Sequence, residues 1–380
     1  MLAPEHPLVR QRARRTRLRR RVVAGVLTGL VLVAGDGVAP EVVQDRELAA
    51  QVAAVLPGLQ AFVEHERGLA FRRPVEVELV AEDEFVAALG GGRGRAADDD
   101  AGATLTGLGQ LADGDDLDEQ LADQRQDGIV GFYDDQSGYL VLRGRQLDAY
   151  ARLVLVHELV HALQDQHGLL DAAPSEAADD ERELAFAALV EGDATRVERA
   201  WWQAQPPAVR REIGDDSWVW SESSTGVLDL DAQGFPYYAG PVLVQGLLAL
   251  GGQAALDAAY QDPPTSTAQV LHSGRPAGQQ VEPPSTSAWV LDRGVLGELG
   301  LASLLDVDPL EDGPQAAWAG DRFVTVREGG ATCTYDDVLT RDAAGRARLL
   351  TALDRWAGRQ HDAQVRARGR RGLRLRSCTA

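Results

Sequence analysis

The segment His157–His167, with the sequence HELVHALQDQH, constrains this chain more than any other, because it holds three of the seven histidines. His157 and His161 are four residues apart, so on a helix both imidazoles lie on one face and can bind the same metal ion. Glu158 follows the first histidine and can reach a metal-bound water as a general base. The segment therefore predicts two metal ligands and a base on one helix face.

The third ligand has to come from elsewhere, because a catalytic Zn²⁺ takes three protein ligands and leaves one position for water. His167 has the offset used by metzincins, but Gln164 stands where that class needs glycine. If the helix continues, His167 is rotated by about 280° and displaced by about 15 Å from His157, out of reach of the metal. We expect Glu191 on the next helix to be the third ligand, with Asp193 as the alternative.

The surroundings of Glu191 favour a buried position over a solvent-facing one. Apolar residues precede it in the sequence LAFAALVEGDA, and carboxylate oxygen is a normal zinc ligand beside two histidines. Gly192 in the middle of a helix costs about 1 kcal/mol relative to alanine, which predicts close packing against a neighbouring element. Thr195, one turn after Glu191, is expected to face the same way and to support the ligand.

Hydrophobic periodicity predicts the fold class α+β, mostly helical, with a small antiparallel sheet before the motif helix. A strand is expected at Pro74–Val80 and a β-hairpin at Ile129–Gly144. Helices are expected at Glu41–Leu69, Glu82–Leu89, Leu147–His167 and from Ser175 to Trp202. The remainder is expected to be mostly helical, at residues 240–250, 253–260, 265–272, 295–305 and 343–357, with a strand at Phe323–Val326.

Residues 1–40 are predicted to be a signal peptide or a signal anchor. Arginines fill residues 10–21, and the apolar run Val22–Ala34 is only 13 residues long. A permanent membrane span needs about 20 apolar residues. The chain is therefore expected to be exported, either extracellular or anchored through residues 22–34 to the outer face of the cytoplasmic membrane. In that compartment Cys333 and Cys378 are expected to form a disulfide.

One domain is predicted over residues 41–354, with residues 90–128 as a partly disordered insertion and residues 355–380 as a basic C-terminal tail. The net charge is −20, although residues 1–21 and 355–380 each hold eight arginines against a single acidic residue. The body between these ends is strongly acidic, which excludes nucleic acid as the main partner, because phosphate binding needs a positive surface.

Five short blocks occur in an order that resembles a family of exported, largely uncharacterised bacterial zinc metallopeptidases. The blocks are HELVHALQDQH, VEGDA, Phe235–Val244 (FPYYAGPVLV), Asp262–His272 (DPPTSTAQVLH) and Trp318–Val324 (WAGDRFV). That family in turn resembles the gluzincins, the thermolysin-like clan. The resemblance implies a zincin-like domain in which His157, His161 and Glu191 bind Zn²⁺ and Glu158 is the general base. Thermolysin-like enzymes commonly carry an aspartate where this chain has Thr195.

The resemblance also implies a reaction, the hydrolysis of a peptide or protein substrate by a zinc-activated water. Gluzincins add a tyrosine or histidine that donates a hydrogen bond to the oxyanion. Tyr237 and His272 are the candidates for this role, from the two blocks that follow VEGDA. The alternatives are a metallohydrolase with a non-peptide substrate and a catalytically inactive exported module that only binds zinc.

Overall fold

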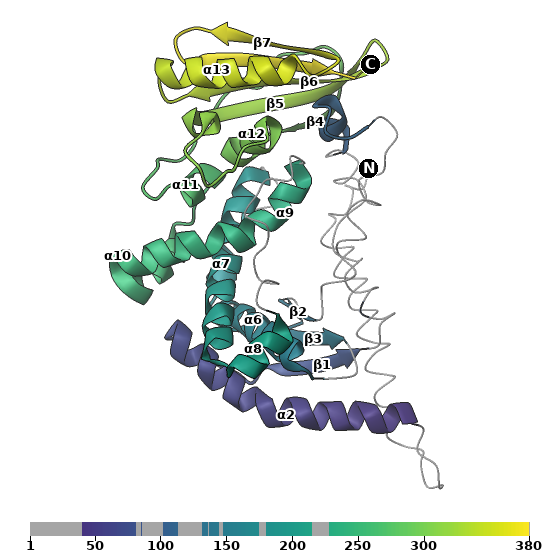
Figure 1. Cartoon of the computed structure of the whole chain (residues 1–380), viewed down its shortest axis with the longest axis vertical. Coiled ribbons are helices and arrows are strands. Elements are labelled where there is room, and N and C mark those ends of the chain that lie inside the picture. Colours follow the sequence, from purple (N-terminus) through teal and green to yellow (C-terminus); the bar gives the residue numbers. More distant parts are fainter. Residues whose placement is uncertain are drawn as a thin grey trace, which may run out of the picture.

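The computed structural model describes residues 40–80, 85, 102–112, 131–135, 137–143, 147–174, 180–214 and 228–379. These residues form a mixed α+β fold, in agreement with the predicted class. Figure 1 shows a small sheet and a long helix at one end of the molecule, a larger sheet at the other end, and helices between them. The predicted helix at Glu82–Leu89, apart from Phe85, and the predicted export segment lie outside the described residues.

The small sheet holds β1 (Glu76–Val80), β2 (Gly131–Asp134) and β3 (Tyr139–Arg143) in the order β1-β3-β2. The hairpin β2–β3 and the strand β1 confirm the predicted positions. The prediction of a purely antiparallel sheet is wrong, because β1 runs parallel to β3. A parallel pair needs a crossover of a dozen or more residues, and the long chain segment between β1 and β2 supplies it.

The helix that carries the histidine motif, α6 (Ala149–Gln166), is a core helix. Asp148 caps its N-terminus by accepting a hydrogen bond from the Ala151 amide at 2.8 Å, and Gly168 follows its C-terminus in a left-handed conformation. Its apolar residues are fully buried on several faces and pack on α2 (Pro40–Arg67) and the small sheet. A helix buried nearly all round is held from every side, so its histidines have fixed positions.

The predicted helix after the motif is α7 (Asp180–Ala204), and it connects the two ends of the molecule. Its second half packs in the same core as α6, whereas Ala185, Phe186 and Leu189 of its first half pack with the next helices. The predicted cap at Ser175 lies outside the described residues. A short 3₁₀ helix η1 (Leu169–Ala172) links α6 to α7, and α8 (Pro207–Ile213) follows α7.

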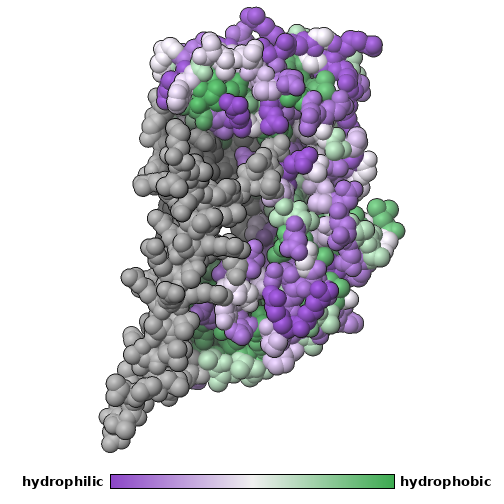
Figure 2. All heavy atoms as spheres, turned by 180° about the vertical axis from the view of Figure 1, so that it is seen from behind, coloured by the Kyte–Doolittle hydropathy of each residue, from purple (hydrophilic) through white to green (hydrophobic). Residues whose placement is uncertain are grey.

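Three helices follow where the sequence predicts helix, namely α10 (Gly240–Gln261), α11 (Thr267–Leu271) and α12 (Gly297–Leu305). The helix α9 (Leu228–Tyr238), which precedes them, was not among the predicted helices. Non-helical backbone at Gly251 and Gly252 bends α10 in its middle. Val242 and Leu250 of α10 are exposed. Figure 2 views the molecule from behind and shows hydrophobic residues protruding on the right, which is the side of α10 in that view. By length and composition, Gly234–Gln261 is the one described helical stretch apolar enough to cross a membrane.

The larger sheet corrects the prediction that the remainder is mostly helical. It holds β4 (Trp289–Gly294), β5 (Trp318–Glu328), β6 (Ala331–Thr340), β7 (Asp362–Arg368) and β8 (Gly372–Cys378), all antiparallel, in the order β4-β5-β6-β8-β7. The 3₁₀ helix η2 (Pro314–Ala317) precedes β5, and the predicted helix α13 (Ala343–Ala357) packs on the sheet. Residues 362–378 are thus strands of the folded core rather than a basic tail.

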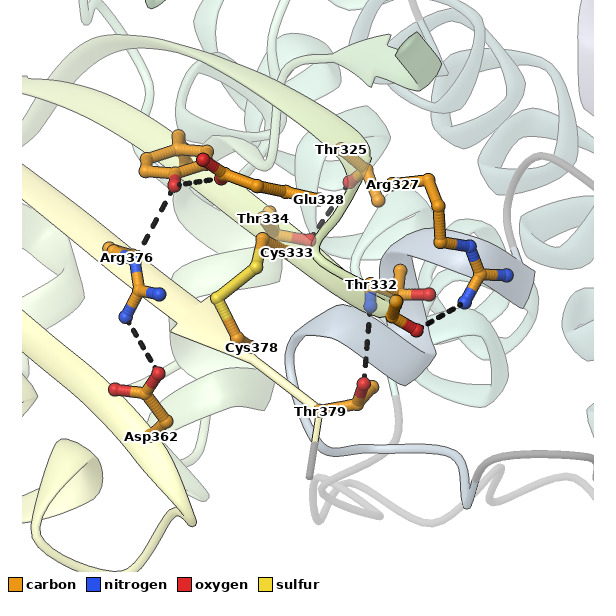
Figure 3. Close-up of a disulfide and its surroundings, with 12 residues drawn as sticks. Thr325, Arg327, Glu328, Thr332, Cys333, Thr334, Asp362, Arg376, Cys378 and Thr379 are labelled. Atoms are coloured by element: carbon orange, nitrogen blue, oxygen red, sulfur yellow. Dashed lines mark hydrogen bonds and ion pairs between the residues drawn. A yellow bond between two sulfur atoms is a disulfide. The ribbon is translucent and has the colours of Figure 1, made fainter. Parts of the chain in front are cut away.

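A disulfide joins Cys333 of β6 to Cys378 of β8, as the sequence predicts. The two residues are direct partners in the strand register, with Cα atoms 4.1 Å apart. Figure 3 shows the bond across the two strands, with Thr379 bonded back to Thr332 beside it. The end of the chain is therefore covalently attached to the centre of the sheet.

Part of the predicted insertion at 90–128 is ordered against this sheet. Residues 102–107 form a helical turn, and the Thr104 hydroxyl lies 2.9 Å from that of Thr325 on β5. Leu108 packs in the core between the sheet and α13. The rest of the predicted insertion lies outside the described residues.

Candidate metal centre

The structure brings His157, His161 and Glu191 together, as the sequence predicts. One ligand atom from each residue lies within 4.8 Å of the other two, so the group could hold a metal ion. Glu191 Oε2 is 3.0 Å from His157 Nε2 and 3.4 Å from His161 Nε2. These three side chains are only 11–22% exposed, which shields the centre from bulk water while leaving it accessible.

The packing of α7 on α6 sets this geometry. Contacts between the helices join His157 to Glu198, both histidines to Glu191, and Gln164 to the Val190 carbonyl. Residues further along α6 contact residues earlier on α7, so the two helices are antiparallel. Glu191 therefore faces the turn of α6 that carries both histidines.

Gly192 explains how α7 reaches its position. A Cβ atom added there would lie 2.3 Å from the Gly240 carbonyl carbon at the start of α10. The backbones of α7 and α10 thus meet where only glycine fits, as the mid-helix glycine predicts. This contact fixes the segment of α7 that presents the neighbouring Glu191.

Each histidine is oriented by a second residue through its other ring nitrogen. Glu198 Oε2 lies 3.1 Å from His157 Nδ1, and Gln164 Oε1 lies 2.9 Å from His161 Nδ1. A carboxylate and an amide oxygen only accept hydrogen bonds, so each Nδ1 carries a proton and each Nε2 points to the centre. Such contacts fix the ring and raise its basicity as a ligand.

The charges of the centre perturb one another strongly. Burial alone would raise the pKa of Glu191, but the imidazoles of His161 and His157 hold it well below its ordinary value. Burial would lower the pKa of His157, but the carboxylates of Glu198 and Glu191 hold it well above the usual range. Glu191 is therefore an anion fixed between two imidazoles, as a carboxylate ligand should be.

Glu158, the predicted base, lies beside the three ligands and is bound to the small sheet. Its Oε2 accepts a hydrogen bond from the Tyr133 amide of β2 at 2.7 Å. Burial raises the pKa of Glu158, whereas the two imidazoles oppose that rise. A carboxylate with a raised pKa is better matched to proton transfer near neutral pH.

Of the two candidate hydrogen-bond donors, Tyr237 lies at the centre and His272 does not contact it. The Tyr237 ring is 6.3 Å from the His157 ring, centre to centre, and the Glu191 carboxylate together with burial raises the Tyr237 pKa well above its usual value. Its phenol therefore stays protonated and can donate. His272 instead bonds Glu298 of α12 at 2.7 Å, and among the described residues no bond joins it to the three ligands.

The alternative third ligands are excluded by their own contacts. His167 at the C-cap of α6 turns away and lies 2.8 Å from the Ala70 carbonyl through Nε2. Asp193 forms an ion pair with Arg67 at 2.7 Å, and neither side chain is exposed. Thr195 does not support Glu191 as expected: its hydroxyl is buried and has no hydrogen-bond partner within the described ranges.

Glu198 and Gln164 were not predicted to belong to the site, although the spacing of each in the sequence is a signal. Glu198 follows Glu191 by seven residues, which is two helical turns on the same face. Gln164 follows His161 by three residues and faces the same side of α6. Glu198, three residues beyond Thr195, bonds His157, whereas the Thr195 hydroxyl forms no hydrogen bond to Glu191.

Comparisons with protein-family models, with curated proteins and with solved structures give no match for this chain. The function is therefore inferred from the centre itself. It offers two imidazoles and a carboxylate that could hold a metal ion, with a second carboxylate and a protonated phenol beside them.

Proposed function

We propose that this chain is an exported zinc-dependent metallopeptidase with a zincin-like, gluzincin-type centre. The observation that carries the proposal is the convergence of His157, His161 and Glu191 with Glu158 alongside. Zinc bonds of about 2.0–2.1 Å would place tetrahedral ligand atoms about 3.4 Å apart. The 3.0 and 3.4 Å separations of the Glu191 oxygen from the two imidazoles match that requirement.

The residues around the ligands supply the steps of peptide hydrolysis. Bound Zn²⁺ would lower the pKa of a water to about 7 and polarise the peptide carbonyl. Glu158 takes the proton from the attacking water and then passes it to the leaving amine. Tyr237 would donate a hydrogen bond to the oxyanion through the phenol that the neighbouring carboxylates and burial keep protonated.

The position of β2 favours a peptide as the substrate. In the order β1-β3-β2 this strand is at the edge of the small sheet, and its Tyr133 amide already bonds Glu158. An extended peptide that adds to this edge would pass beside the base. The cysteine pair supports export, because disulfides persist in oxidising compartments. Anchoring through residues 22–34 and the exclusion of nucleic acid remain part of the proposal.

The test is to measure zinc content and cleavage of casein by the purified full chain. Wild type should contain about one zinc per chain and cleave. Glu158→Gln should keep the zinc and lose cleavage, because it removes the base and no ligand. His167→Ala, on the same helix but turned away from the centre, is the matched control and should keep both. Full activity of Glu158→Gln would contradict the mechanism.

The two alternatives differ from the proposal in measurable ways. A metallohydrolase with a non-peptide substrate would bind zinc and leave every peptide intact. An inactive zinc-binding module would bind zinc as a structural staple, but structural zinc is almost always four-coordinate. Among the described residues the centre gathers three ligands, which favours a catalytic site with one open position.

A further inference from the structure

Gln164 occupies the position where the metzincin pattern would require glycine. Its side chain contacts both the ligand His161 and residues of α7 and α10. Its side chain is 1% exposed and lies one turn beyond His161 on α6. The amide oxygen is 2.9 Å from His161 Nδ1. The amide nitrogen donates to three acceptors, the Val190 carbonyl at 3.1 Å, the Tyr260 hydroxyl at 2.8 Å and the Asp193 carboxylate at 3.3 Å.

These acceptors determine which way the amide points. If the amide were turned over, its oxygen would face the Val190 carbonyl and the Asp193 carboxylate. Acceptors would then oppose acceptors in a buried site, where an unmade hydrogen bond is costly. The oxygen must therefore face His161. The Nδ1 atom is kept protonated as a result, and Nε2 is free to bind a metal.

A buried ion pair holds the acceptors themselves in place. Arg67, at the end of α2, contacts Asp193 at 2.7 Å and Asp257 of α10 at 2.6 Å. Tyr260, also on α10, is fully buried and donates to Asp193 at 3.1 Å. Four helices, α2, α6, α7 and α10, thus meet at one polar cluster directly behind His161.

We propose that Gln164 is a positioning residue of the metal centre: its amide, clamped by Val190, Tyr260 and the Arg67–Asp193 ion pair, holds His161 in the tautomer and orientation that direct Nε2 at the metal. The inference rests on the proposed function only in requiring that a metal binds, and it does not require that a peptide is cleaved. In this role Gln164 supports His161 as Glu198 supports His157.

The chain offers a close control two residues along the same helix. Gln166 is also buried, but its oxygen accepts from the Arg72 amide at 2.8 Å and the Arg73 amide at 3.1 Å, so it attaches the chain before β1 and touches no ligand. Gln164→Ala and Gln166→Ala delete the same side chain from the same helix. Only the first should change the metal centre if the amide positions His161.

The experiment measures Zn²⁺ affinity by competition with a chelator, and the visible spectrum of the Co²⁺-substituted full chain. Gln164→Ala should weaken Zn²⁺ binding by roughly 10–100-fold, as loss of an outer hydrogen-bond partner commonly does. It should also shift the Co²⁺ bands, because the imidazole is no longer fixed. Gln166→Ala should keep both properties of wild type. Tyr260→Phe, which removes one hydroxyl and keeps the ring, should give a smaller loss in the same direction.

The outcomes separate this inference from the proposed function. Wild-type Zn²⁺ affinity and Co²⁺ bands in Gln164→Ala, or an equal loss in Gln166→Ala, would overturn the role of Gln164. If Gln164→Ala does not fold, Tyr260→Phe decides, and unchanged affinity and bands in that variant overturn the role. A wild type that binds Zn²⁺ without cleaving casein overturns the peptidase alone, whereas a wild type that binds no Zn²⁺ overturns both.

Discussion

At the scale of residues, two substitutions distinguish Glu191, the expected third ligand, from Asp193, the alternative. Glu191→Ala removes the carboxylate that lies within 3.4 Å of both imidazoles. Zinc content should therefore fall to a small fraction of the wild-type value. Asp193→Asn serves as the contrast: it disrupts the buried pair with Arg67 and should lower the melting temperature, whereas zinc content should fall less than in Glu191→Ala, because Asp193 reaches the centre only through Gln164. Retention of zinc by Glu191→Ala would identify a different third ligand.

A second residue-scale prediction concerns Asp336, a fully buried aspartate of β6. Burial and the neighbouring carboxylates of Asp321 and Asp337 raise its pKa well above the ordinary value. The folded state therefore binds a proton that the unfolded state releases, and stability falls as pH rises from about 4 towards the raised pKa. Asp321 does not readily take up the proton in place of Asp336, because its carboxylate already accepts hydrogen bonds from Leu296, Gly297 and Trp318.

Asp336→Asn removes the proton linkage and keeps the shape. Melting temperatures of the variant and of wild type, measured from pH 4 to pH 8, should diverge as pH increases, with the variant gaining relative stability. The difference between the two melting temperatures is the quantity that matters, since carboxylates that do not contact Asp336 titrate equally in both proteins. A difference that stays constant across this range would mean that Asp336 is not protonated in the fold.

Much of the centre was predictable at this scale, because its ligands obey local helical spacing. His157, Glu158 and His161 lie within one turn, and Glu191 follows on the next helix beside a glycine that predicts close packing. Glu198 was not predicted, because its role depends on two full turns of α7 facing α6. The contact of His272 was not predictable either, because only the packing of α12 brings Glu298 to its imidazole.

At the scale of elements, the contact between α7 and α10 is the most restrictive one near the centre. Gly192→Ala would place a methyl group against the Gly240 backbone, which cannot move as a flexible side chain would. We expect a loss of stability of about 1–3 kcal/mol, together with weaker zinc binding, because Glu191 is the adjacent residue. Thermal unfolding and chelator competition measure the two effects.

Gly58→Ala provides the comparison for that substitution. Gly58 is also within a helix, α2, but a Cβ atom there meets nothing within 4 Å. Alanine should stabilise this helix by up to about 1 kcal/mol and leave zinc binding unchanged. Equal effects of the two substitutions would show that helix propensity, rather than the contact with Gly240, controls the site.

Two of the strands that the sequence did not predict, β6 and β8, differ from a typical strand pattern for different reasons. β6 turns polar residues inward, with Thr334, Asp336 and Thr340 fully buried, so the alternation of apolar and polar residues is missing. β8 does alternate, with Leu373 and Leu375 inside, but the arginines between them resemble a charged tail. Helices were easier to predict, because their apolar faces extend over longer stretches of chain.

At the scale of the whole molecule, the disulfide and the metal centre belong to opposite ends and different hydrophobic clusters. The Cys333–Cys378 bond closes a loop of 45 residues, which stabilises the fold by about 4 kcal/mol in the chain-entropy estimate. The Cys333→Ser/Cys378→Ser double variant should therefore melt at a lower temperature and still bind zinc with wild-type affinity. Loss of zinc affinity in the folded variant would show that the large sheet supports the centre.

The ion pairs of Arg67 have a consequence for the order in which this molecule matures. Its partners Asp193 and Asp257 are 126 and 190 residues further along the chain. Since a ribosome delivers the amino end first, Arg67 has to wait for both carboxylates, and the support behind His161 is completed only after α10 has emerged. A nascent chain that already carries all three ligands therefore lacks the support behind His161 until α10 has been synthesised.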